Sequence, residues 1–104
     1  MIVEERIYTI HPGKMSDFLD LYAEEGLQII SPILGNLIGY FTTDIGDLNK
    51  AVHLWGYDSY AEREKRRASL NSHRAWLEFG GKILPYIAHM ENRILVPTSF
   101  SPIK

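Results

Sequence analysis

The hydrophobic residues of this chain alternate with a period of two in some segments and follow helical spacing in others. The order of these segments restricts the folds that the chain can adopt. The alternating segments, predicted to be strands, are residues 2–10, 37–45, 51–58 and 90–96, and the predicted helices are residues 14–31 and 60–84. The expected order of elements is therefore β-α-β-β-α-β.

Turn-forming residues separate these segments. His11-Pro12-Gly13 ends the first strand, and Ser31-Pro32 is expected to break the first helix because proline lacks a backbone N–H. Gly46-Asp47 favours a hairpin between the two central strands. The second helix is expected to begin at Ser59-Tyr60-Ala61-Glu62, which matches a capping box, and to be interrupted at Asn71-Ser72.

Two helical connections around a central hairpin, with right-handed crossovers, define the ferredoxin-like arrangement. We therefore predict a single α+β domain that spans residues 1–104. In this βαββαβ fold both helices cover one face of a four-stranded antiparallel sheet. Its other face would be open to solvent or to a partner.

The alternation places Tyr8, Tyr40, Trp55 and Tyr57 together on one face of the predicted sheet. We expect this face to lie opposite the helices, where a monomer would expose an aromatic patch of a kind that soluble proteins rarely tolerate. A second copy of the same sheet, related by a two-fold axis, would cover the patch. The sequence therefore predicts a homodimer, and it leaves open assembly into higher oligomers.

Composition excludes several classes of protein. With 11 Lys and Arg against 13 Asp and Glu, the chain has a formal net charge of −2, and we expect no nucleic-acid partner. Cysteine is absent, which excludes disulfides and thiolate metal sites. The N-terminal segment lacks the features of a signal peptide, and no apolar run reaches the roughly 20 residues that cross a bilayer. We therefore expect a cytoplasmic protein without membrane association.

No cofactor or metal is predicted. The histidines, at positions 11, 53, 73 and 89, do not follow a recognised metal-ligand spacing. Glycine-rich phosphate loops and serine nucleophile motifs are also missing from the sequence.

His53 is the best candidate for a catalytic or ligand-orienting group, because a neutral imidazole can transfer a proton or orient a ligand near neutral pH. Tyr8, Tyr40 and Trp55 are its expected neighbours and would form the walls of a ligand site. The alternative is a partly buried strand histidine whose nitrogens bind the backbone or water.

Arg6 and Arg93 are candidate ligand-binding residues, because they lie on strands that should be adjacent and could bind a carboxylate or phosphate. The interpretation that we prefer is cross-strand ion pairing with nearby glutamates. Residues 62–67, EREKRR, read as the solvated face of a helix in which Glu62 pairs with Arg66, although a subunit contact or an anion site remains open.

The chain resembles the NIPSNAP family over nearly its whole length. The resemblance is carried by EERIYTIHPGK at the start, LIGYFTTDIGDLNKAVHLWGYDSYAEREKRR in the middle and ENRILVP near the end. It implies a dimeric α/β barrel, in which the sheets of two ferredoxin-like subunits pack together. Eukaryotic members are associated with mitochondria, vesicles and adaptor-like interactions. The family motif carries no established catalytic residues, and other families of dimeric α/β barrels include cofactor-independent monooxygenases and haem-handling enzymes.

Two hypotheses on function follow. In the first, a small aromatic or carbonyl-containing molecule binds in the barrel, where cofactor-independent chemistry could take place. In the second, the domain is a non-catalytic homo-oligomeric interaction or adaptor module. The sequence alone does not decide whether the protein is an enzyme.

Overall fold

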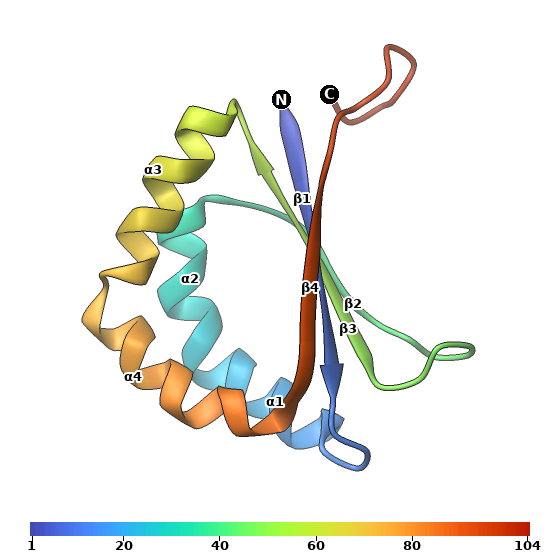
Figure 1. Cartoon of the computed structure of the whole chain (residues 1–104), viewed down its shortest axis with the longest axis vertical. Coiled ribbons are helices and arrows are strands. Elements are labelled where there is room, and N and C mark those ends of the chain that lie inside the picture. Colours follow the sequence, from blue (N-terminus) through green and yellow to red (C-terminus); the bar gives the residue numbers. More distant parts are fainter.

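The computed structural model describes all 104 residues and has two layers, with the helices on one face of a single sheet (Figure 1). The strands are β1 (Ile2–Ile10), β2 (Asn36–Thr42), β3 (Lys50–Tyr57) and β4 (Ile87–Leu95). The helices are α1 (Met15–Leu21), the π-helical segment η1 (Tyr22–Gly26), α2 (Leu27–Leu34), α3 (Tyr60–Asn71), α4 (Arg74–Ile83) and the short 3₁₀ helix η2 (Leu84–Tyr86). None of the helices is long and apolar enough to span a membrane.

The sheet confirms the predicted ferredoxin-like α+β fold. Its strand order is β2-β3-β1-β4, and all neighbouring strands are antiparallel. A register shift in β2 places Leu37 opposite Trp55 but Gly39 opposite Leu54. Strict alternation over residues 37–45 predicts that Leu37, Gly39 and Phe41 share one face, but the bulge turns Leu37 to the other face.

The first helical region continues past Ser31-Pro32, which corrects the predicted break. Pro32 lies in the last turn of α2, which ends at Leu34, before Gly35 with a φ of 91°. The proline removes only the hydrogen bond to the carbonyl of Gln28. Burial of Ile30 and Leu34, whose side chains are 2% and 1% exposed, outweighs that loss.

The second helical region begins and breaks as predicted. The Ser59 hydroxyl accepts a hydrogen bond from the backbone N–H of Glu62 at 3.1 Å. The Glu62 carboxylate does not reach back to complete the capping box. It accepts a hydrogen bond from Nε of Arg66 at 2.8 Å, which is the predicted i,i+4 pair. The chain leaves α3 at Asn71 and resumes in α4 at Arg74.

The aromatic face of the sheet is the face that the helices cover, and this overturns the expected orientation. Tyr8, Trp55 and Tyr57 are buried within the core, together with helix residues such as Phe18 and Phe79. The apolar sides of the helices pack against the face of the sheet that carries these aromatic side chains. The homodimer was predicted from an exposed aromatic patch, and this patch does not exist because the helices cover it. In a dimer that pairs its sheets, the second copy would have to cover the opposite face.

That opposite face, which we call the open face, combines apolar and charged residues. Val3, Ile7 and Leu54 lie on it, with Phe41 56% exposed at its edge.

Candidate functional site: a cavity between the helices and the sheet

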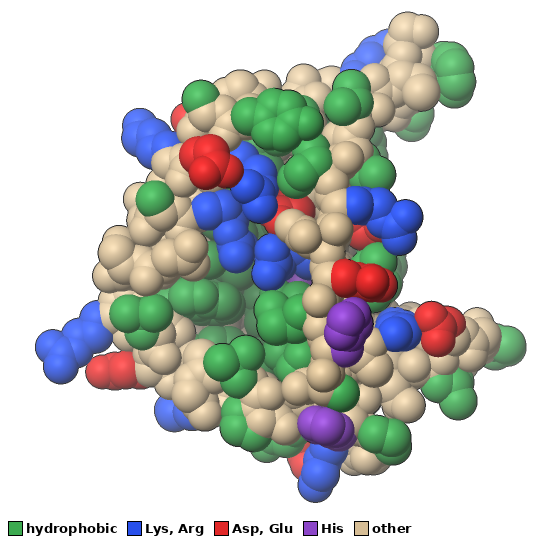
Figure 2. All heavy atoms as spheres, in the orientation of Figure 1, with side chains coloured by type: hydrophobic (Ala, Val, Ile, Leu, Met, Phe, Trp, Pro, Cys, Tyr) green, Lys and Arg blue, Asp and Glu red, His purple; other side chains and the backbone are tan.

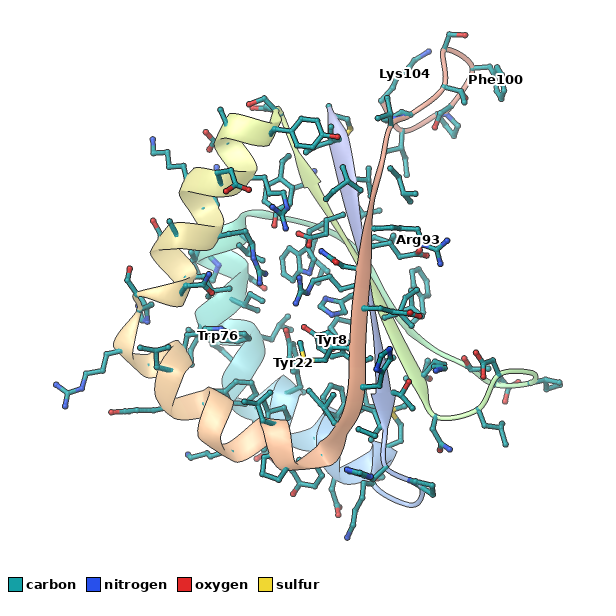
Figure 3. The ribbon with its side chains drawn as sticks, viewed as in Figure 1. Tyr8, Tyr22, Trp76, Arg93, Phe100 and Lys104 are labelled. Atoms are coloured by element: carbon teal, nitrogen blue, oxygen red, sulfur yellow. The ribbon has the colours of Figure 1, made fainter.

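A partly open cavity of about 280 Å³ lies between the two layers. Its apolar walls come from several elements, including Tyr22 in η1, Ile30 in α2, Trp76 in α4 and Met90 in β4. Tyr8, Tyr22 and Trp76 lie within the space between helices and sheet (Figure 3). This volume is near the lower end of the about 300–1,000 Å³ that is usual for small-molecule sites.

Gly80 and Gly81 form part of the helical wall, and neither glycine is required by close packing. A Cβ atom built at either position would meet no heavy atom within 4 Å. Glycine inside a helix costs about 1 kcal/mol relative to alanine. The missing side chains therefore lower the stability of α4 while they leave space beside Trp76.

The polar side of the cavity is formed by Arg6, Tyr8, Arg67 and Asn71. Nε of Arg6 donates a hydrogen bond to the Tyr8 hydroxyl oxygen at 3.1 Å. Because that oxygen already accepts a hydrogen bond, the Tyr8 O–H is free to donate to a ligand. Figure 2 shows basic side chains gathered beside α3 and hydrophobic side chains nearer α4.

A buried carboxylate outside the cavity wall, that of Glu4, accepts a hydrogen bond from Arg6 and fixes its position. Glu4 is 0% exposed and accepts four hydrogen bonds, at 3.0 Å from Arg6, at 3.1 and 3.0 Å from Arg63, and at 2.8 Å from Asn92. Burial alone would raise the pKa of Glu4. The hydrogen bonds from Arg63 and Asn92 and the charges of Arg6 and Arg63 outweigh it and lower that pKa to about 2. Glu4 is therefore ionised at neutral pH and fixes both guanidinium groups.

His53 lies behind the cavity wall and not in it. Its ring stacks on Tyr40 with centroids 4.5 Å apart and meets the edge of Tyr8 at 4.9 Å. Nε1 of Trp55 donates to Nδ1 of His53 at 2.8 Å, which places the imidazole proton on Nε2. Burial, together with the charges of Arg6 and Arg67, lowers the pKa of His53 to about 3. His53 is therefore neutral at physiological pH.

The structure brings five of the six predicted site residues together. Arg6 and Tyr8 line the cavity, while the buried His53 and Trp55 and the partly buried Tyr40 form a layer behind Tyr8. Arg93 does not belong to this group, because it pairs with Glu5 on the open face and points away from the cavity (Figure 3). The cross-strand ion pair Arg93–Glu5 matches the preferred interpretation for Arg93, whereas Arg6 pairs with Glu4 within its own strand.

The sequence did not identify Asn71 or Trp76 as site residues, and it included Arg67 only in the less favoured interpretation of residues 62–67 as an anion site. The solvated-face interpretation of residues 62–67 is wrong for Arg63 and Arg67, because both guanidinium groups extend toward the sheet. A signal was present in the spacing, since Arg63, Arg67 and the fully buried Leu70 lie on one stripe of α3. Because Leu70 is part of the core, the side of α3 that carries Arg63 and Arg67 faces the sheet as well.

Histidine and acidic side chains do not converge in groups of three that could hold a metal ion. The polar groups on the cavity wall are guanidinium, phenol and amide groups.

These features define an α+β domain with a small-molecule-sized cavity between a ferredoxin-like sheet and its helices. The sequence pattern of the NIPSNAP family matches residues 3–102, so the chain belongs to the NIPSNAP family.

Solved structures agree with this assignment. A NIPSNAP family protein from Agrobacterium tumefaciens is 52% identical, with a TM-score of 0.97 over 99% of this chain and 98% of that one. An antibiotic biosynthesis monooxygenase, 13% identical with a TM-score of 0.63 over 94% of this chain and 99% of its own, shares only the fold.

The curated relatives are longer proteins. Protein NipSnap homolog 2 of Danio rerio is 35% identical over 99% of this chain, and that alignment covers 35% of the relative. The human protein NipSnap homolog 2 is 33% identical over 99% of this chain and likewise 35% of its own length. The chain thus spans about a third of the length of the curated relatives that it matches.

Proposed function

We propose that this domain binds a small aromatic or carbonyl-containing molecule in the cavity between its helices and its sheet. The observation that carries the proposal is a cavity with apolar walls and, on one side, the hydrogen-bonded pair Arg6–Tyr8. Few convergent polar groups in an otherwise apolar pocket are the usual features of a small-molecule site. Tyr22 and Trp76 supply aromatic surface for the ligand body.

The polar pair suits a carbonyl oxygen. Tyr8 can donate its O–H to that oxygen, and the Arg6 guanidinium beside it would stabilise any negative charge that develops there. The cavity wall, however, includes no Asp, Glu or His that could remove a proton from the ligand. His53, the predicted catalytic group, is shielded by Tyr8 and Tyr40. The arrangement therefore favours binding, with Tyr8 as the group nearest to any reaction.

The binding proposal is tested by thermal unfolding against a panel of small aromatic and carbonyl compounds. A ligand present at 100 times its Kd stabilises the folded state by about 2.7 kcal/mol. For a domain of this size that corresponds to a rise in Tm on the order of 10 °C. We expect Gly80→Leu to abolish this rise because its side chain would occupy space beside Trp76.

Glu78→Leu is the matched control, since it adds the same side chain to the same helix at a position whose side chain is 70% exposed. This variant should retain the full ligand-induced shift. If no compound raises the Tm of the wild type, or if Gly80→Leu binds as well as Glu78→Leu, the cavity is not the binding site.

The alternative function, a homo-oligomeric interaction module, is supported by the open face. Phe41, Leu95 and Val96 are 56%, 39% and 70% exposed, and Leu54 lies on the same face in the inner strand β3. Exposed apolar surface of this kind is typical of a protein interface. A second copy of the chain, bound sheet to sheet, would cover it.

We expect the wild type to be a dimer in light scattering at micromolar concentration and Leu54→Glu to be a monomer. A charge placed on the centre of a buried interface loses its hydration without gaining a partner. Glu64→Gln, on the outer side of α3 with a side chain that is 74% exposed, should leave the mass unchanged. A monomeric wild type would contradict the proposed dimer.

A further inference from the structure

We propose that the cavity selects a monoanionic ligand, a carboxylate on a small apolar or aromatic body, and that Arg67 is the residue that recognises the charge. This inference rests on the proposed binding function and adds the chemical class of the ligand. The inference depends on which arginines between the helices and the sheet are paired with acceptors of the protein and which are not.

The arginines around Glu4 are not equivalent. Arg63 donates to both oxygens of Glu4 and also pairs with Glu64 at 2.8 Å. Arg66 pairs with Glu62 and donates to the carbonyl of Ile33 at 3.2 Å. These guanidinium groups are therefore occupied by protein acceptors.

Arg67 has no such partner. It lies one residue further along α3, half-buried on the cavity wall, and neither a hydrogen bond nor an ion pair joins its guanidinium to another residue. Burial, together with the positive charge of Arg6, lowers the pKa of Arg67. The surrounding protein therefore disfavours the charged form of this guanidinium and does not neutralise it with an acidic partner. A partly desolvated guanidinium without an acceptor is a costly feature unless a ligand supplies one.

Arg6 contributes to the same side of the cavity. It uses Nε for the Tyr8 hydroxyl and one terminal nitrogen for Glu4, which leaves its second terminal nitrogen without a protein acceptor. Arg6, Arg67 and the Tyr8 hydroxyl can therefore converge on two oxygen atoms of one group. A planar carboxylate presents two such oxygens and is the preferred partner of guanidinium groups.

The balance of charge indicates a single negative charge on the ligand. Arg6, Arg63 and Arg67 are opposed only by the carboxylates of Glu4 and Glu64, so one positive charge remains uncompensated. The cavity wall itself contains no acidic residue. A carboxylate would neutralise this charge, whereas a phosphate monoester, with about −1.5 to −2 charges at neutral pH, would exceed it.

The apolar walls define the rest of the ligand. Trp76, Ile83 and Ile87 surround the volume away from the arginines. A volume of about 280 Å³ accommodates one aromatic ring or a short aliphatic chain. The ligand class is therefore an amphipathic acid with its carboxylate toward α3 and its apolar body toward α4.

The test compares three probes with one apolar body, which are 3-phenylpropionate, its neutral amide and the corresponding phosphonate, by isothermal titration calorimetry on the full chain. We expect the carboxylate to bind roughly tenfold to a hundredfold more tightly than the amide, because a hydrogen bond to a charged group is stronger than one between neutral groups. In Arg67→Gln this preference should disappear, while the affinity for the amide stays within about twofold. Arg67→Lys should retain part of the preference.

Arg74→Gln is the control for long-range charge, because that side chain is 93% exposed on α4, and it should keep the full preference. Because no intramolecular hydrogen bond or ion pair holds the Arg67 guanidinium, the Tm of Arg67→Gln should be equal to or above that of the wild type, which would show that a loss of binding is not a loss of folding.

The outcomes separate this inference from the binding proposal. Equal affinity for acid and amide, with both abolished by Gly80→Leu, would overturn the charge selection and leave the cavity as the binding site. A preference for the acid that survives in Arg67→Gln would overturn the role of Arg67, and tighter binding of the phosphonate would overturn the carboxylate assignment. No binding of any probe would contradict both.

Discussion

Replacement of Glu4 by leucine should lower the free energy of unfolding by about 3–5 kcal/mol, the usual cost of removing one partner from a buried ion pair. Glu4 accepts four hydrogen bonds from Arg6, Arg63 and Asn92 and is fully buried. Without the carboxylate, the guanidinium groups of Arg6 and Arg63 lose their shared buried acceptor and keep only the Tyr8 hydroxyl and the exposed Glu64 carboxylate. Since small domains are stable by about 5–15 kcal/mol, this loss is a large share of the total. Urea unfolding followed by tryptophan fluorescence measures it.

The neighbouring residue provides the matched control. Glu5 pairs with Arg93 on the open face, where the arginine side chain is 61% exposed. Exposed pairs of this kind contribute about 0–1 kcal/mol, so Glu5→Leu should change the stability of the isolated subunit little. A loss from Glu4→Leu no larger than that from Glu5→Leu would show that the buried network does not stabilise the fold.

A double variant separates the charge from the packing. When Arg63→Met is added to Glu4→Leu, one of the two guanidinium groups that have lost their buried acceptor is removed. We expect the double variant to regain about 1–2 kcal/mol relative to Glu4→Leu alone, a coupling energy typical of residues in direct contact. Additive losses would instead mean that the two side chains stabilise the fold independently.

Acidification should destabilise the protein below about pH 6.5, well before the carboxylates titrate. The folded protein holds the pKa of His53 at about 3, against an ordinary value of 6.5. Between these values the unfolded chain binds a proton at this residue and the folded chain does not. The free energy of unfolding therefore falls by about 1.4 kcal/mol for each pH unit below 6.5. Urea unfolding at pH 7.5, 6.5, 5.5 and 5.0 follows this loss.

Glu4 adds a second step of the same sign. Its pKa is about 2 in the folded protein, against an ordinary value of 4.5. The stability that its ionised form contributes is present above pH 4.5 and is lost as the pH falls toward 2. Below pH 4.5 the two residues act together, and the slope of stability against pH should steepen.

The variant His53→Phe tests the assignment of the first step. Phenylalanine can stack on Tyr40 and Tyr8 but leaves the indole N–H of Trp55 without an acceptor, so the variant should be less stable at pH 7 by about 1–3 kcal/mol. Its stability should nevertheless become nearly independent of pH between 6.5 and 5. His11→Gln, at an exposed position after β1, should keep the wild-type slope. An unchanged slope in His53→Phe would assign the acid sensitivity to another group.

Much of the fold could be predicted because it depends on local patterns. The alternation of residues 2–10 and 51–58, the turn at Gly46-Asp47 and the serine cap at Ser59 each depend on a few neighbouring residues. The break at Ser31-Pro32 was predicted wrongly because the continuation of this helix depends on tertiary packing and not on neighbouring residues. Proline weakens a helix locally, and only the burial of Ile30 and Leu34 against the sheet decides that the helix continues.

The candidate site could be predicted only in part. Tyr8, Tyr40, His53 and Trp55 lie on one face of the sheet, as the alternation predicted, because every second residue of a strand points to the same face. Arg67 was missed because a helix rich in Arg, Lys and Glu has the same composition whether its charges face water or a buried carboxylate. The acceptor that draws Arg63 inward, Glu4, is 59 residues away in the chain.

The sequence by itself determined the order of the elements, the family and, except at the bulge in β2, the set of side chains on each face of the sheet. It did not determine which face the helices cover, because alternation assigns residues to two faces without distinguishing inside from outside. The tertiary structure decided that point by packing the helices on the aromatic face. That choice places His53 out of reach of a ligand, encloses the cavity beside Arg6 and Tyr8, and leaves Arg67 as a charge without a partner in the protein.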